Sequence, residues 1–413
     1  MAILESRNAR TVRPLLGFVL VLLLFPASRF AGASSPQLDS ISLSFPTPQV
    51  GYVLSLYDCA AKTCAALRST HDAGSSWDVA PLPRQLQQDL QIDSWDNYPT
   101  AYAALTVHFA DASNGWIYGL VPVATTPTSA SSNVVSRVWS THNGGRTWNQ
   151  VHLGPLTNTG GQVVQMATNA GRTYLFGASF QHGRAYLLTT RSNSDTWKGT
   201  ANSFTGSGIP AGGTQLEASF TFSGSSGWFV AGNDRGYTAS ARLLSNGSWG
   251  TWKGPSFEKF GPSFTPISAV NDRVLLAEGE SAGFVYPPAS SVPPGWNDSA
   301  TWLFISNDAG VTFKPFRQLS NSYHATYSTG PGLPATPSPG TILLQRSSGS
   351  DYHLVRTTNW GRTWQVVLAH STSQVIFTSR TTGYAIVQDG STPATRSLYR
   401  TIDAGSHWDH VSV

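Results

Sequence analysis

One eight-residue pattern recurs along almost the whole chain and constrains its fold more than any other feature. The pattern reads Ser/Thr-x-Asp/Asn-x-Gly-x-Ser/Thr-Trp, and its first copy runs from Thr70 to Trp77. The closing aromatic residues of the copies fall at positions 77, 148, 197, 252, 313, 364 and 408. A unit of this length, repeated seven times, predicts an array in which neighbouring units bury each other's apolar faces.

Each copy has the residues of a hairpin turn. The Asp or Asn side chain accepts hydrogen bonds from nearby backbone N–H groups, and the Gly two positions later adopts a backbone angle that other residues avoid. The Trp starts a return strand and is large enough to fill the gap between units. We therefore assign a structural role to ten residues of the five well-preserved copies: Asp72, Trp77, Asn143, Trp148, Asp308, Phe313, Asn359, Trp364, Asp403 and Trp408.

Two further copies, Thr190–Trp197 and Ser245–Trp252, are eroded, and we refer to all seven copies as the repeat turns. The pattern resembles the Asp-box, or BNR, repeat. That resemblance implies that the repeat turns lie on the outer hairpins of β-propeller blades, away from the central ligand face. The chain resembles the photosystem II stability/assembly factor-like and sialidase-like superfamily over nearly all of its length after the N-terminal segment. Xyloglucan-cleaving glycosidases and sortilin-type receptors carry the same repeat.

A second signature precedes several repeat turns and helps to define the unit. Phe45 is followed by Gly51-Tyr52, and a Phe followed five or six residues later by Gly-aromatic recurs at Phe109, Phe222 and Phe377. Each instance predicts a strand, a tight turn and a second strand, so that a unit holds four short antiparallel strands. The fold class expected is all-β, a seven-bladed β-propeller, or six blades if one eroded unit is vestigial.

The expected blades lie near residues 38–83, 102–154, 160–200, 215–255, 264–318, 320–368 and 373–413, in one domain spanning 34–413. The first and last units each have enough sequence for four strands. The ring is therefore expected to close by side-chain packing between the first and last blades, without an exchanged strand. Long apolar helical periodicity is absent after residue 33.

The first 33 residues have the features of an export signal. Arg7, Arg10 and Arg13 precede an apolar run at residues 15–25, and Ala31-Gly32-Ala33 offers a small-residue cleavage site. The apolar run is short for a membrane span. We expect a signal peptide at 1–33 and a secreted or extracytoplasmic protein, with an uncleaved N-terminal membrane anchor as the alternative.

The basic isoelectric point, near 9.1, comes largely from that segment. Residues 1–33 carry four arginines and one glutamate, which leaves a net charge of +1 for the remainder of a chain whose total is +4. Such a balance gives no electrostatic footprint for nucleic acid, so no nucleic-acid partner is expected.

The two cysteines, Cys59 and Cys64, lie in one short stretch of the first unit. Outside the cytosol, a local disulfide bracing a turn between two strands is the favoured interpretation. A metal site would need further ligands, and only His71 follows closely in the sequence. The histidines elsewhere form no ligand set with metal-binding spacing, so we expect neither a metal nor a cofactor.

Catalytic chemistry has one weak candidate, Glu217. A sialidase would need an arginine cluster, a Tyr–Glu nucleophile pair and an Asp acid/base, and its usual N-terminal Arg-Ile-Pro motif is absent, with Ser44-Phe45-Pro46 in that place. Glu217 precedes an inner strand and could face the centre of the ring. A glycosidase also requires a second carboxyl group at a defined separation, and the sequence does not name one. A solvated or hydrogen-bonded carboxylate is the favoured interpretation.

Four insertions interrupt the regular period, at residues 84–101, 121–135, 281–299 and 321–340. In repeat folds such insertions often collect on one face, which is commonly the binding face. Their aromatic residues are the expected ligand contacts: Trp95, Tyr98, Tyr286, Trp296, Tyr323 and Tyr327. The alternative is that these Pro-, Ser- and Thr-rich segments are flexible linkers.

The sequence thus favours an exported, non-catalytic propeller that acts as a monomeric binding or assembly module. Its expected partner is a protein or carbohydrate of the cell envelope or medium, with membrane contact only through an uncleaved N-terminal segment. A sialidase-like or other glycoside hydrolase is the alternative function.

Overall fold

The computed structural model describes residues 38–59, 62–90, 105–122, 134–158, 160–199, 216–232, 238–254, 266–280, 301–320, 334–348, 351–388 and 395–413. The chain divides into two compact units, Met1–Ser35 and Pro36–Val413. All described residues belong to the second unit, so the expected signal peptide lies outside them.

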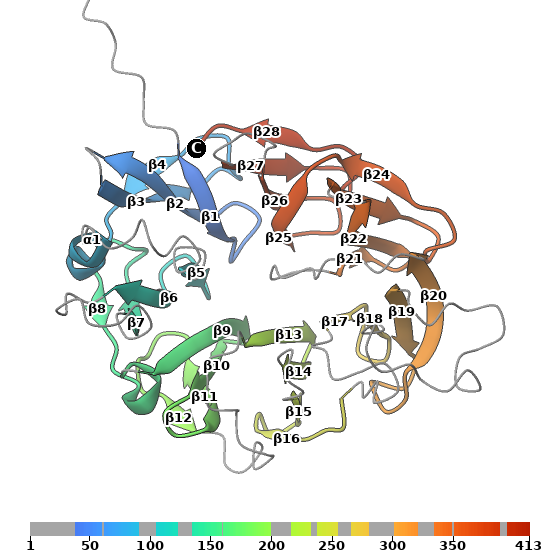
Figure 1. Cartoon of the computed structure of the whole chain (residues 1–413), viewed down its shortest axis with the longest axis horizontal. Coiled ribbons are helices and arrows are strands. Elements are labelled where there is room, and N and C mark those ends of the chain that lie inside the picture. Colours follow the sequence, from blue (N-terminus) through green and yellow to red (C-terminus); the bar gives the residue numbers. More distant parts are fainter. Residues whose placement is uncertain are drawn as a thin grey trace, which may run out of the picture. The chain divides into compact units, whose positions relative to one another are not determined.

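The second unit is a seven-bladed β-propeller, as predicted (Figure 1). Blade 1 holds β1 (Asp39–Ser44), β2 (Gly51–Cys59), β3 (Lys62–Thr70) and β4 (Asp78–Ala80), and blade 2 holds β5 (Thr106–Phe109), β6 (Gly115–Pro122), β7 (Val134–Thr141) and β8 (Asn149–Gln150). Blade 3 holds β9 (Gly161–Asn169), β10 (Arg172–Ser179), β11 (Arg184–Arg191) and β12 (Lys198–Gly199). Blade 4 holds β13 (Glu217–Ser223), β14 (Ser226–Gly232), β15 (Thr238–Leu243) and β16 (Trp249–Thr251).

The remaining blades repeat this arrangement. Blade 5 holds β17 (Ile267–Ala269), β18 (Leu275–Glu280), β19 (Thr301–Ser306) and β20 (Lys314–Ser320). Blade 6 holds β21 (Ala335–Ser338), β22 (Thr341–Ser348), β23 (Asp351–Thr357) and β24 (Gln365–Leu368), and blade 7 holds β25 (Ser371–Phe377), β26 (Gly383–Gln388), β27 (Arg396–Thr401) and β28 (Asp409–Val411). Every blade is an antiparallel sheet of four strands that are consecutive in the chain, and its first strand lies nearest the centre of the ring (Figure 1).

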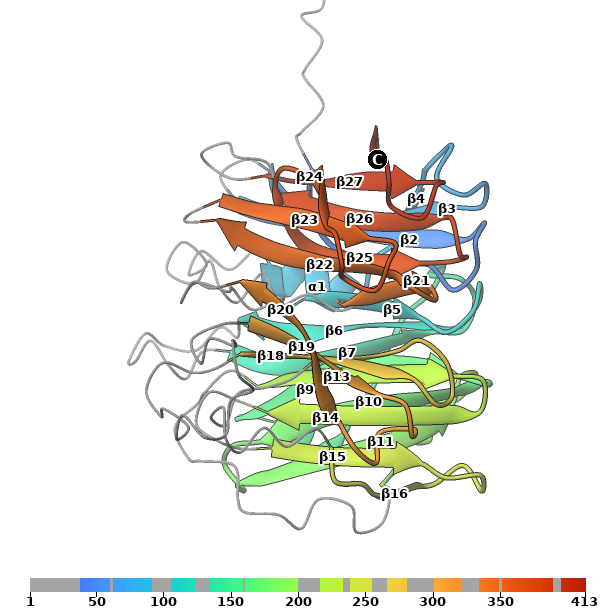
Figure 2. The same cartoon turned by 90° about the vertical axis from the view of Figure 1, so that its right-hand side faces the viewer.

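This connectivity gives the propeller two faces, between which the strands run (Figure 2). Because the strands alternate in direction, the turn from first to second strand and the repeat turn lie on one face, which we call the turn face. The connection from second to third strand and the link to the next blade lie on the other, which we call the loop face.

The Phe and Gly-aromatic signature has a steric cause. The ring of the Phe at or beside the end of a first strand packs against the Gly at or beside the start of the second. A Cβ added at Gly115, Gly227 or Gly383 would come within 2.5–2.9 Å of the preceding Phe ring, and the approach at Gly51 is closer still. Only glycine allows this packing, so the signature marks where each blade folds back on itself.

The first strands of neighbouring blades are connected by side-chain hydrogen bonds to backbone groups. The backbone N–H of Val107 donates to Ser42 Oγ at 3.1 Å, and that of Phe109 donates to Ser44 Oγ at 2.8 Å. Farther round the ring, the N–H of Ala269 donates to Thr221 Oγ1 at 2.7 Å. These bonds satisfy backbone donors on strand edges that no neighbouring strand covers.

The ring closes between blades 7 and 1 without an exchanged strand, as predicted. The side-chain amide of Gln374 binds the backbone of Leu43 twice: Leu43 N–H donates to Oε1 at 3.0 Å and Nε2 donates to the carbonyl at 2.9 Å. Arg396 forms an ion pair with Asp39, with an Nη2–Oδ2 distance of 2.6 Å. A shared apolar cluster that includes Leu43 and Tyr384 completes the closing contact.

One helix interrupts a segment that we expected to be an irregular insertion. Residues Arg84–Leu90 form α1, which is only two turns long and therefore too short to leave a helical period in the sequence. Its buried residues Leu86 and Leu90 join the apolar cluster between blades 1 and 2. The segment 84–101 thus begins as an ordered part of the core.

Candidate functional site

The loop face is where the sequence places its ligand contacts. All six aromatic residues named for this role, Trp95, Tyr98, Tyr286, Trp296, Tyr323 and Tyr327, lie outside the described residues. Their flanking strands are described, however. Glu280 ends β18 and Thr301 begins β19, while Ser320 ends β20 and Ala335 begins β21. Both connections therefore leave and re-enter the propeller at the loop face.

Glu217 is the first residue of β13, at the loop-face end of the innermost strand of blade 4. It is half-buried, and its Cα lies opposite that of Gly232 in β14. Glu278 lies in β18 of the next blade. The carboxylate of Asp39, at the start of β1, accepts hydrogen bonds from the backbone N–H, Nε and Nη2 of Arg396.

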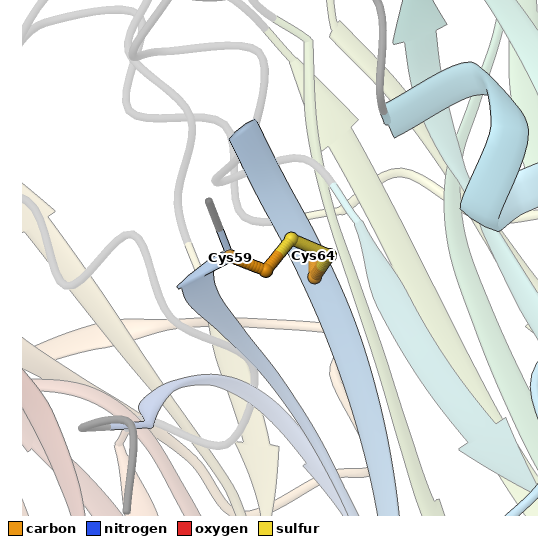
Figure 3. The surroundings of a disulfide bond; sticks show 2 residues. All are labelled: Cys59 and Cys64. Carbon is orange, nitrogen blue, oxygen red and sulfur yellow. A yellow bond between two sulfur atoms is a disulfide. The ribbon is translucent and has the colours of Figure 1, made fainter. Parts of the chain in front are cut away.

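A disulfide joins Cys59 and Cys64 at the loop-face ends of β2 and β3, with a Cα–Cα distance of 5.9 Å (Figure 3). The two strands pair continuously from Gly51 and Thr70 out to Cys59 and Lys62. The bond therefore braces the tip of a long hairpin, which is the role the sequence predicts for these cysteines.

The repeat turns lie on the opposite face and use their polar groups internally. In the first turn, Thr70 Oγ1 donates to Asp72 Oδ1 at 2.7 Å and accepts from the Gly74 N–H at 2.9 Å. Asp72 then accepts from the Ser76 N–H at 2.9 Å and from the Ser76 hydroxyl at 2.6 Å. The turn at Asp308 repeats this geometry with Ser306 and Thr312.

Two turns achieve the same geometry with Asn. Asn143 Nδ2 donates to Thr147 Oγ1 at 2.8 Å, and Asn359 Nδ2 donates to Thr363 Oγ1 at 2.8 Å. Beside Asn, the Thr hydroxyl accepts this hydrogen bond, whereas beside Asp the Ser or Thr hydroxyl donates it. In the last turn a histidine takes the hydroxyl position, and His407 Nδ1 lies 2.6 Å from Asp403 Oδ2. These networks engage each acidic group in the hydrogen bonds of its own turn.

At four consecutive junctions, the repeat turn also receives a hydrogen bond from a side chain of the preceding blade. The acceptor is the carbonyl of the residue before the conserved Gly. Trp228 Nε1 donates to Ala309 at 3.0 Å, Arg317 Nε to Trp360 at 3.1 Å, Arg356 Nε to Ala404 at 2.7 Å and Tyr384 Oη to Ala73 at 2.9 Å. The repeat turn therefore joins blades as well as closing its own hairpin. Two of these four donors, Trp228 and Tyr384, are the aromatic residues of the Gly-aromatic pairs found in the sequence.

The carbonyl acceptor belongs to a residue with left-handed backbone geometry. Ala73, Ala309 and Ala404 have φ near +59°, and the corresponding residue in blade 6 is Trp360, at +60°. A bulky side chain is rare in this region of conformational space. The indole of Trp360 packs over the turn at Gly340 and joins the apolar cluster between blades 5 and 6. This packing compensates for the backbone strain.

Hydrogen bonding sets the acidity of the turn carboxyls. The bonds from Ser76 and Thr70 lower the pKa of Asp72 to about 2, and those from Thr312 and Ser306 lower the pKa of Asp308 to about 2. For Asp403, burial acts to raise the pKa, but the bonds from His407 and Thr401 outweigh it and bring the pKa to about 2.

These three carboxyls predict an acid limb of the stability profile. Their folded pKa lies below the value of 3.8 typical of a free side chain, so their contribution is present above about pH 4 and is lost as the pH falls towards 2. The triple variant Asp72→Asn, Asp308→Asn, Asp403→Asn should keep its turns, as Asn143 and Asn359 do, but should show a flatter profile. Melting temperatures by circular dichroism between pH 2 and 7 measure this. Identical profiles for variant and wild type would contradict the assignment.

Metal and membrane chemistry find no support in the described part of the chain. No group of three or more His, Cys, Asp or Glu residues there could hold a metal ion. None of its helices has the length and apolar character needed to cross a bilayer.

No protein-family model and no curated protein matches the chain. Solved structures do resemble it, and the three described next have identities of 7–15%. A prolyl endopeptidase aligns with 12% identity over 90% of this chain and 49% of its own, with a TM-score of 0.51. The β-propeller domain of the Trilobed protease from Pyrococcus furiosus aligns with 7% identity over 92% and 97%, at 0.48. The GH74 xyloglucanase from Xanthomonas campestris aligns with 15% identity over 92% and 55%, at 0.41.

The chain therefore spans about half the length of the endopeptidase and of the xyloglucanase. At 12% identity, the likeness to the prolyl endopeptidase shows the propeller fold alone. The function has to be argued from the residues of this chain.

Proposed function

We propose that this propeller is a non-catalytic binding module whose loop face takes a protein or glycan partner outside the cytoplasm. The observation that carries the proposal is the connectivity, which brings both ends of the long connections 281–300 and 321–333 to the loop face. The repeat turns, on the other face, use their Asp and Asn side chains for their own hydrogen bonds. A rigid ring that presents loops on one face is a common architecture for recognition.

The disulfide-braced hairpin and α1 support this proposal. Both belong to the loop-face side of blade 1, and α1 anchors the start of the segment that carries Trp95 and Tyr98. A braced scaffold loses less conformational entropy when a partner binds. Export through residues 1–33 would place the module where a disulfide is stable.

A glycoside hydrolase remains the second candidate, because Glu217 lies on an innermost strand at the loop face. Hydrolysis would need a second carboxyl group at a defined separation from it. The described carboxylate at the start of β1, Asp39, is committed to Arg396.

The test uses Glu217→Gln, which keeps the size of the side chain and removes its charge. We expect the full chain to show no turnover of chromogenic sialosides or xyloglucan oligosaccharides, and the variant to bind envelope partners as the wild type does. Turnover by the wild type that falls by about a hundredfold or more in the variant would establish catalysis instead. Glu278→Gln serves as the matched control, because Glu278 lies on a second strand.

A partner is sought with two baits, the full propeller and a variant in which residues 281–299 are replaced by a short Gly-Ser linker. If both baits captured the same envelope protein or glycan, residues 281–299 would not be needed for binding. Melting temperatures of the two baits show that the ring itself is intact.

A further inference from the structure

Blade 3 has an unusual distribution of charge on its two surfaces. In a chain with only 12% charged residues, the segment 160–199 carries four cations, Arg172, Arg184, Arg191 and Lys198, and a single carboxylate, Asp195. The sheet directs these groups to opposite sides.

Asp195 is engaged on the side of blade 3 that faces blade 2. The hydroxyl of Ser140 donates to its Oδ2 at 2.7 Å, and His142 Nε2 lies 3.2 Å from the same oxygen. Ser140 and His142 both belong to the end of β7 and the repeat turn of blade 2. The only acidic group of blade 3 is thereby held away from its cations.

Three of the cations lie on the side that faces blade 4. Arg172 and Arg191 are direct cross-strand partners in β10 and β11, and Lys198 lies opposite Thr189 in β12. Tyr174, two positions from Arg172, and Leu187, four positions from Arg191, pack into the apolar cluster shared with blade 4. The alternation of side chains in a strand therefore puts all three cations on that surface, at its turn-face end.

The three cations are exposed and have no acidic partner among the described residues, whose ion pairs are His142–Asp195, Arg396–Asp39 and His407–Asp403. Like charges directly opposite in a sheet are destabilising. The guanidinium of Arg172 lies against the hairpin of blade 4, where a Cβ on Gly247 would be 3.8 Å from Arg172 Nε. The pair of Arg172 and Arg191 therefore lowers the stability of the blade, so stability does not explain it.

We propose that Arg172, Arg191 and Lys198 form a binding site for an anionic polysaccharide, one that carries uronate carboxylates or sulfate esters, at the edge between blades 3 and 4. Guanidinium groups bind such oxyanions through paired N–H donors, and lysine adds a point charge. The three side chains span three adjacent strands, or about 10 Å, which suits one or two anionic groups rather than the dense charge of a nucleic acid.

The surroundings favour a glycan over an acidic peptide. The neighbouring turn of blade 4 exposes Asn246 and Ser248, whose side chains hydrogen-bond to each other and form a polar surface that suits the hydroxyls of a sugar. Leu244 is the single exposed large apolar residue recorded on this blade edge among the described residues. A peptide interface would normally present an aromatic or apolar centre. The site lies on the turn face, so it is distinct from the loop face of the proposed function.

The test compares two double variants of the full chain with equal changes in charge. Arg172→Gln with Arg191→Gln removes the cross-strand pair. Arg362→Gln with Arg380→Gln removes two exposed arginines from the turn face of blades 6 and 7. Heparin is the sulfated probe, polygalacturonate the carboxylated probe and dextran the neutral control, with affinities measured by titration calorimetry at two salt concentrations.

We expect the first variant to bind heparin or polygalacturonate about tenfold or more weakly, and the second to bind within about twofold of the wild type. Without ligand, the first variant should melt no lower than the wild type, because a repulsive pair has been removed. Equal losses in both variants, or affinity no greater than for dextran, would overturn the proposal. Tighter binding of poly-L-glutamate with the same dependence on Arg172 and Arg191 would assign the site to an acidic peptide instead.

Discussion

Tyr384→Ala should reduce the free energy of unfolding by about 3–5 kcal/mol, the range for removing a large buried aromatic side chain. Tyr384 is fully buried at the contact between blades 7 and 1, and its ring stacks on that of Phe45 with centroids 3.7 Å apart. Its hydroxyl also donates to the carbonyl of Ala73. The substitution therefore removes apolar packing, an aromatic pair and an interblade hydrogen bond together. Urea denaturation followed by tryptophan fluorescence measures the effect.

Tyr384→Phe separates these contributions. It keeps the stacked ring and loses only the hydroxyl, so the expected loss is about 1 kcal/mol. If the alanine and phenylalanine variants lost equal stability, the packing at the closing contact would contribute nothing, and the proposed importance of this junction would be wrong.

Gln374→Leu is expected to cost about 2–4 kcal/mol, because it leaves a buried N–H and a buried carbonyl of Leu43 without partners. Leucine has a similar volume, so little packing is lost. The effect would then report the hydrogen bonds of one side chain that acts in place of a neighbouring strand. Thermal and urea denaturation of the variant measure it.

Gln345→Leu is the matched control for this prediction. Gln345 accepts a single hydrogen bond, from the Thr372 N–H at 2.9 Å, between blades 6 and 7. One unsatisfied donor should cost less than a donor and an acceptor together. A larger loss for Gln345→Leu than for Gln374→Leu would contradict this account of the closing contact.

The architecture followed from the sequence because its signals are local. Turn residues and the Phe over Gly packing act within one hairpin, so their spacing predicts strands, blades and their number. Even the eroded turn at Thr190 belongs to a complete four-stranded blade, because the alternation of β9–β11 survives where Ser192 replaces the acidic residue. Among the described residues, the first strand of the sixth blade begins at Ala335, within the predicted range 320–368.

The contacts between blades could not be predicted in the same way. Arg317, Arg356 and Gln374 bind groups of the next blade that lie 43, 48 and 331 residues away along the chain, and no residue near them indicates the partner. The cross-strand pair of Arg172 and Arg191 likewise depends on register, which one sequence does not fix. The expected aromatic contacts of the loop face stay a prediction, because they lie outside the described residues.

Closure without an exchanged strand has a mechanical consequence. Among the described residues, the first and last blades are joined through side chains such as Gln374, Tyr384 and the Asp39–Arg396 pair, while each blade keeps its own backbone ladder. A pulling force applied between β1 and β28 would load those side-chain contacts before any ladder of backbone bonds. The ring would then open at the junction between blades 7 and 1, with all seven blades still folded.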